Sequence, residues 1–190
     1  MLALYTFSGA SSASGIAFGL GFALILFGSV LVHELGHAIV ARAFRLGPVE
    51  ITLHGFGGLT RYRAGASAPR SLLITLAGPM AGLALGVFSL VVLQFTYNPL
   101  IAMVARFNLF WSLFNLLPMY PMDGGMALAH TLTLLKMHPS DALRWAARVG
   151  VLVAVIVGVI AAWSQQYFII LIAGLSLYQS FQIATADRLR

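Results

Sequence analysis

One long apolar stretch decides the fold: GIAFGLGFALILFGSVLVHELGHAIVARAF, which runs from Gly15 to Phe44. A helix needs about 20 apolar residues to cross the hydrocarbon core of a bilayer, so this stretch can span a membrane with some tilt. Before Arg42, its only titratable side chains belong to His33, Glu34 and His37. The stretch therefore predicts a membrane-spanning helix with a polar site in its second half.

The composition of the whole chain agrees with a membrane protein. The chain has 190 residues, of which 60% are hydrophobic and only 8% are charged. Ordinary soluble domains carry about 25% charged residues, so a water-soluble single domain is excluded. The chain has no cysteine, which excludes disulfides, thiolate zinc sites and cysteine nucleophiles.

The rest of the chain alternates between apolar segments and short connections. Further apolar segments run over residues 72–95, 107–135, 144–163 and 167–184. The second of these is interrupted at Pro118 to Gly125, where two prolines and two glycines prevent a regular helix. Residues 51–62 alternate around a glycine turn, which is typical of a β-hairpin. We predict an all-α polytopic membrane protein: a helical bundle of about four main spans, a broken helix at the Asp-Gly motif and a small membrane-associated β-hairpin.

Small residues recur at every fourth position in two of the segments. One stripe runs along the 72–95 segment and the other along the 144–163 segment; they comprise Gly78, Gly82 and Gly86, and Gly150, Ala154, Gly158 and Ala162. Such stripes favour close helix packing in lipid over a cofactor groove.

The basic residues predict how the chain is oriented. The formal net charge of +6 could suggest nucleic acid, but the basic residues lie between apolar runs, so we expect no nucleic-acid partner. If the loop after the first span is cytoplasmic, Arg106 alone of the eleven basic residues lies outside. We therefore expect a multi-pass protein of the cell membrane, with the amino terminus outside and the carboxyl terminus and active-site side cytoplasmic.

Two of the five acidic residues, Glu34 and Asp123, lie inside apolar stretches. An ionisable residue within a membrane is costly and indicates function. His33 and His37 are four residues apart on the predicted helix, so both imidazoles leave one face and can bind one metal ion. Glu34 is offset by about 100° and can reach a metal-bound water. The alternative is two core histidines and a buried glutamate, but no basic partner for Glu34 precedes Arg42 in this span.

A catalytic zinc ion needs a third protein ligand if one position is to stay open for water. The candidates are His54, His130, His138, Asp123 and the other acids. At about 1.5 Å per residue, Asp123 lies at a depth similar to that of His33. Irregular backbone at this depth must be buried or line a water-filled cavity, so Asp123 is the best third ligand. The alternative for Asp123 is a plain turn.

The combination of His33-Glu34-Leu35-Gly36-His37 with Asn115 to Gly124 closely resembles the site-2 protease family of intramembrane zinc metalloproteases. That family pairs HExxH on one helix with NxxPxxxxDG on another. The Ile51–Tyr62 hairpin and Ala77-Gly78-Pro79 also look like family features, so the resemblance covers about residues 20–135. Gly82 stands where many members have asparagine, and Met126 where a basic residue is frequent.

The resemblance implies a zinc metallo-endopeptidase with one Zn²⁺ per chain, held by His33, His37 and Asp123, and with Glu34 as the catalytic acid/base. The reaction would be hydrolysis of a peptide bond within or beside the transmembrane segment of a membrane-protein substrate, in regulated intramembrane proteolysis. We expect residues 1–190 to form a single transmembrane metalloprotease domain, with a catalytic core at about 15–136 and a closing helical pair at about 141–185. The lipid bilayer is an expected partner, and a homo-oligomer stays possible.

Three further residues are candidates for substrate binding. Asn115 could donate a hydrogen bond to the oxyanion or the substrate backbone, or could instead tie the broken segment together. Gly57 and Gly58 would let an extended substrate approach the edge of the hairpin closely. Two rival functions remain: a pseudoprotease or membrane chaperone, against which the intact motif weighs, and an ion transporter, for which we find no polar path across the spans.

Overall fold

The computed structural model describes residues 13–54, 57–63 and 65–186, and its helical bundle carries one small sheet. The elements, in chain order, are α2 (Ala13–Ala43), β1 (Val49–His54), β2 (Gly57–Tyr62), α3 (Ala68–Val92), α4 (Pro99–Asn115), α5 (Asp123–Leu134), α6 (Pro139–Trp163) and α7 (Tyr167–Thr185). In length and apolar composition, α2, α3, α6 and α7 could each cross a membrane. The prediction of a polytopic helical bundle with about four main spans is confirmed.

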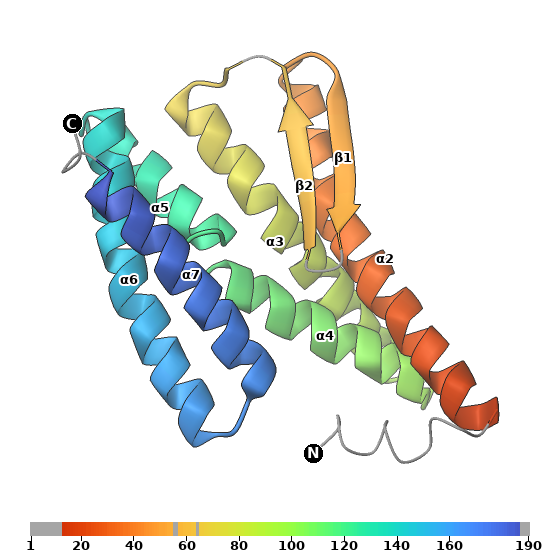
Figure 1. The fold of residues 1–190 in the computed structure, drawn as a ribbon. Helices are drawn as coiled ribbons and strands as arrows, with labels where there is room; N and C mark the ends of the chain where they lie inside the picture. The colour runs from red at the N-terminus through yellow and green to blue at the C-terminus, as the bar shows by residue number, and fades with distance from the viewer. Residues whose placement is uncertain (1–12, 55–56, 64, 187–190) are drawn as a thin grey trace.

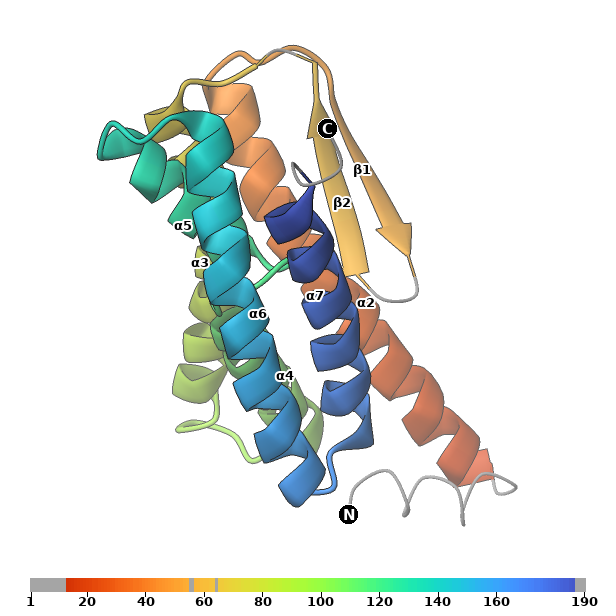
Figure 2. The same cartoon turned by 60° about the vertical axis from the view of Figure 1, so that its left-hand side comes forward.

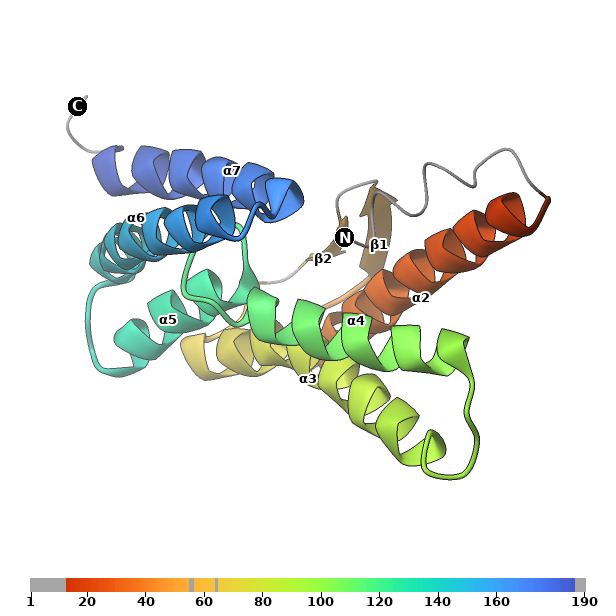
Figure 3. The same ribbon diagram turned by 90° about the horizontal axis from the view of Figure 1, so that it is seen from below.

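Helix α5 packs against both α3 and α6, and so joins α2, α3 and α4 to the α6–α7 pair (Figure 1). Seen from below, α2 and the α6–α7 pair lie on opposite sides, with α3, α4 and α5 between them (Figure 3). The end of α2, the start of α3 and the start of α6 lie at one end of the bundle. The connections from α3 to α4 and from α6 to α7 lie at the other end.

The predicted helix break lies between α4 and α5. Pro118 and Pro121 prevent a regular helix across residues 116–122, and the Tyr120–Pro121 peptide bond is cis. The middle of the segment is buried, since Met119 is 0% and Tyr120 is 5% exposed. The backbone N–H of Tyr120 donates a hydrogen bond to Ser180 Oγ of α7 at 3.2 Å. A side chain from the closing pair thus satisfies an amide that the break leaves without a helical partner.

Small residues bring the helices into close contact, as their spacing predicts. The α3 glycines Gly82 and Gly86 are buried, and a Cβ at either would overlap side chains of α4. On α6, Ala154 is buried, but the fourth member of the stripe is exposed and Ala161 is buried in its place. Residues four apart are 400° apart, so a stripe with that spacing drifts by about 40° per step and leaves the packed face.

The β-hairpin lies beside the second half of α2 (Figures 1 and 2). Its strands pair antiparallel, from Val49 opposite Tyr62 to His54 opposite Gly57, and its turn at residues 55–56 lies outside the described residues. Tyr62 packs against the buried cluster of Ala41, Leu46 and Ile74. This contact anchors the open end of the hairpin to α2 and α3.

A close contact between α2 and α3 at Gly36 yields a stability prediction. A Cβ on Gly36 would overlap the main-chain carbonyl of Ala77, whereas one on Gly28, also in α2, would meet nothing within 4 Å. Gly36→Ala should therefore lower the free energy of unfolding by about 1–3 kcal/mol, because main chain must move to admit the methyl group. Gly28→Ala should instead raise it by up to about 1 kcal/mol, because its methyl group meets no neighbour and alanine favours a helix over glycine. Thermal unfolding in detergent compares the two variants, and equal stability would contradict the packing.

Candidate metal centre

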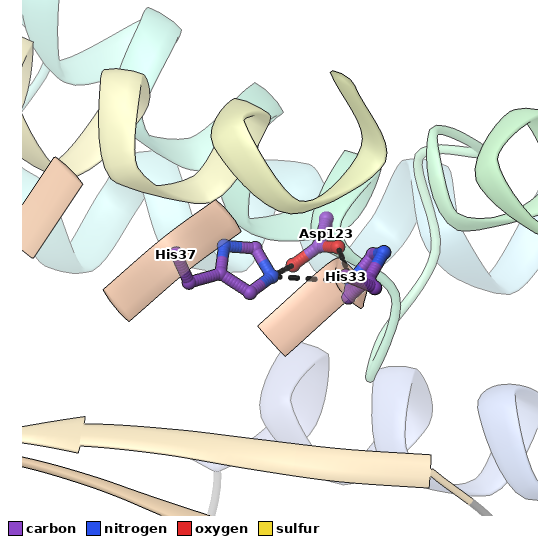
Figure 4. Close-up of side chains that lie close together, drawn as sticks. All are labelled: His33, His37 and Asp123. Carbon is purple, nitrogen blue, oxygen red and sulfur yellow. Dashed lines mark hydrogen bonds and ion pairs between the residues drawn. The ribbon is translucent and has the colours of Figure 1, made fainter. Parts of the chain in front are cut away.

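The structure brings together the side chains of His33, His37 and Asp123 (Figure 4). The two histidines leave one face of α2 a turn apart, and Asp123 is the first residue of α5. His33 Nε2 lies 3.0 Å from Asp123 Oδ2, and His37 Nε2 lies 3.5 Å from Asp123 Oδ1. The two Nε2 atoms are 3.1 Å apart. Among the described residues this is the only such group of possible metal ligands.

The hydrogen bonds around this group fit a cation. His37 Nδ1 lies 2.7 Å from the carbonyl oxygen of Ile74, to which it donates. In a neutral imidazole the Nε2 atom then carries a lone pair, and it faces His33 Nε2 and the carboxylate. Asp123 Oδ2 is buried without a hydrogen-bond partner among the described residues, although His33 Nε2 is close. Two imidazoles and a carboxylate facing one another form a donor set suited to zinc.

Glycines leave room for the group and for its neighbours. A Cβ on Gly78 of α3 would overlap the imidazole of His37 and lie 2.8 Å from His33 Nε2. A Cβ on Gly124 would overlap the main-chain carbonyls of Leu116 and Leu117 in the broken segment. The close packing of α3 against the histidines, and of α5 against residues 116–117, therefore fixes the positions of the histidines and of Asp123.

Glu34 lies beside the three-residue group without belonging to it. Its side chain is 5% exposed, and Thr60 of β2 donates a hydrogen bond to its Oε2 atom at 2.6 Å. A buried carboxylate needs such a donor, and among the described residues no other side chain donates to it. The position fits an acid or base acting next to the group better than a further ligand.

These residues line a cavity of about 460 Å³, which the hairpin borders on one side. The three candidate substrate-binding residues Asn115, Gly57 and Gly58 also line it. Asn115 is 8% exposed, and its amide donates a hydrogen bond to the carbonyl of Trp111 within α4 at 3.0 Å. Gly57 has a φ of +150°, a conformation that side chains disfavour.

The other histidines with described side chains lie outside the group. His130 is half-buried within α5, and His138 pairs with Ser140 Oγ at 2.8 Å. The sequence did not identify Thr60 or the Ile74 carbonyl as parts of the site. In the structure Thr60 and Gly58 are two residues apart on β2, which puts both on one strand face.

Comparisons with known proteins agree with this geometry. The family model for Peptidase family M50 matches residues 21–98. A solved structure, the site-2 protease from Methanocaldococcus jannaschii, superposes with a TM-score of 0.69 at 30% identity, covering 85% of this chain and 76% of that one.

Two curated relatives have also been compared with this chain, and one of them is named as a zinc metalloprotease. Zinc metalloprotease MJ0392 of Methanocaldococcus jannaschii is 32% identical over 79% of this chain and 45% of its own length. Stage IV sporulation protein FB of Bacillus subtilis is 30% identical over 52% of this chain and 36% of its own. The chain spans less than half the length of these two relatives. The similarity to the solved site-2 protease extends over most of both chains. This multi-pass membrane protein therefore belongs to the site-2 protease family, peptidase family M50.

Proposed function

We propose that this chain is an intramembrane zinc metalloprotease that cleaves a peptide bond within or beside the transmembrane segment of a membrane-protein substrate. The observation that carries the proposal is the convergence of His33, His37 and Asp123 next to the buried Glu34, in a cavity between apolar helices. The matched relatives include a protein named as a zinc metalloprotease, which supports the same reaction. Regulated intramembrane proteolysis is the process we propose it serves.

His33, His37 and Asp123 would hold the zinc ion through two Nε2 atoms and the carboxylate. A zinc ion bound there supplies Lewis-acid chemistry, since it lowers the pKa of water and polarises a carbonyl group. The Ile74 carbonyl keeps the proton on His37 Nδ1 and so leaves Nε2 free to bind. Gly78 keeps α3 from filling the space in front of both imidazoles.

Glu34 moves the proton in this proposal. Its carboxylate accepts a proton from the attacking water, whose oxygen forms the new bond to the peptide carbonyl carbon. The same proton then passes to the peptide nitrogen as the C–N bond breaks, which releases a neutral amine. Asn115, which lines the cavity, is our candidate donor to the carbonyl oxygen of the substrate.

A helical substrate hides its peptide bonds, so it must be extended near the bond that is cleaved. The two-stranded sheet leaves each strand with one edge outside the β1–β2 ladder, and such an edge can pair with an extended peptide. Gly57 and Gly58 lie where β2 borders the cavity. We propose that a transmembrane segment unwinds there and pairs with the hairpin.

We also propose that the end of the bundle that bears the start of α3 faces the cytoplasm in the cell membrane. The supporting observation is that Arg42, Arg70 and Arg144 lie near the ends of helices that meet at this end (Figure 1). Basic residues are retained on the cytoplasmic side of membrane proteins.

Glu34→Gln tests the proton-transfer role. The variant should lose cleavage of a single-span substrate by about 10²–10⁴-fold, because glutamine cannot accept the proton. It should keep about one zinc per chain by elemental analysis, since Glu34 lies outside the ligand group. The matched control is Glu50→Gln in β1, the other glutamate of the chain, which is exposed and should cleave normally. Full activity of purified Glu34→Gln would contradict the proton-transfer role of Glu34.

Two histidine variants test whether the His33, His37 and Asp123 group binds zinc. His37→Ala should reduce zinc well below one equivalent per chain, because it removes one of three protein ligands. His130→Ala, on a half-buried histidine outside the group, should leave the zinc content unchanged. If the two variants retained the same zinc content, the ligand set would be wrong.

The orientation is testable because the chain has no cysteine, so an introduced one is the only thiol. Ser140 and Ser164 are exposed serines at opposite ends of α6. A membrane-impermeant maleimide added to intact cells should label Ser164→Cys and leave Ser140→Cys unlabelled until the cells are opened. The reverse pattern would invert the proposed topology.

A further inference from the structure

The inward face of β2 lies directly against Glu34. Along β2, Gly58, Thr60 and Tyr62 share one face because side chains alternate along a strand. Tyr62 packs on the cluster that joins α2 to α3, so this face points toward α2. Leu59 belongs to the opposite face and is 40% exposed.

Thr60 contacts Glu34 at two atoms. Its hydroxyl lies 2.6 Å from Glu34 Oε2 and 3.2 Å from the main-chain carbonyl oxygen of Glu34. A hydroxyl has one proton, and the shorter distance assigns it to the carboxylate. The contact thus ties the strand to the side chain of Glu34, and the main-chain carbonyl oxygen of the same residue lies close beside the hydroxyl.

Gly58 leaves room for the other oxygen of the carboxylate, Oε1. A Cβ on Gly58 would lie 2.6 Å from Glu34 Oε1 and would overlap the carbon chain of the side chain. The carboxylate therefore occupies the space that a side chain at position 58 would fill. This is a physical reason for glycine here that does not depend on a substrate backbone.

We infer that Thr60 is a positioning residue for Glu34, a role that rests on the proposed function. The Thr60 hydroxyl holds Oε2, and the open surface of Gly58 admits Oε1, which leaves Oε1 as the oxygen that exchanges the proton. A carboxylate buried among apolar helices has few other donors, so this one hydrogen bond selects its rotamer. Because Thr60 lies on the strand proposed to receive the substrate, the hairpin both receives the peptide and aligns the base.

The first test compares three threonine variants in cleavage assays on the full chain. Thr60→Val should lower kcat on the order of tenfold, with KM and zinc content unchanged, because a charge-assisted hydrogen bond is lost. Thr60→Ser keeps the hydroxyl and should restore most of the kcat. The matched control is Thr52→Val on β1: Thr52 pairs with Leu59 on the opposite face, and its side chain makes no hydrogen bond to another described residue. It should cleave like the wild type.

A second readout does not use cleavage. In chelator-treated protein, Thr60→Val should lower the unfolding midpoint when Glu34 is present and should have a much smaller effect in the Glu34→Ala background. Thr52→Val should behave alike in both backgrounds. This cycle measures the contact whether or not the protein is a protease.

The outcomes separate the inference from the proposed function. If the zinc-loaded wild type cleaves no membrane-protein substrate, the proposed function fails, while the stability cycle still reports on the contact. If the wild type cleaves and Thr60→Val keeps its kcat, the positioning role is wrong. It is equally wrong if Thr52→Val loses as much kcat as Thr60→Val, because the loss would then come from damage to the hairpin.

Discussion

The structure depends on one constraint: polar side chains buried among apolar helices must find partners inside the protein. A single turn of α2 carries three of them. His37 reaches the carbonyl of Ile74 in α3, Glu34 reaches the hydroxyl of Thr60 in β2, and both histidines face Asp123 of α5. Three elements distant in sequence meet at this turn, and each brings a partner that the turn lacks.

The space around these groups is made by glycine. Gly78 lies in front of the imidazoles, and Gly58 lies under the Glu34 carboxylate. Gly36, between the two histidines, lets the backbone of α3 approach α2. Each glycine allows a main chain to lie where a side chain would otherwise stand, so the site is compact enough for groups on four elements to interact. Glycine at these points thus has a role that a search for reactive side chains does not reveal.

Much of the architecture could be predicted because it follows from fixed helical geometry. The rise per residue placed Asp123 at the depth of His33, and the prolines placed the break just before Asp123. Thr60 and Ile74 could not be predicted in the same way. Local periodicity gives a strand and a helix, whereas their docking against α2 depends on tertiary packing, such as that of Tyr62. For Gly58 the sequence suggested closeness to a substrate, and only the docked hairpin shows the carboxylate beside it.

The hydrogen bond between the Tyr120 amide and Ser180 bears on how this protein can change over evolution. Asp123 owes its position to an irregular segment, and one amide of that segment is satisfied from α7 rather than from α2, the helix that carries both histidines. The α6–α7 pair therefore supports the part of the chain that contains the HExxH and Asp-Gly motifs, and an unrelated helix pair could not replace it without losing this hydrogen bond. A recombined chain with a different pair of helices in place of α6 and α7 would keep His33 and His37. Its segment before Asp123 would lack the hydrogen bond that Ser180 accepts.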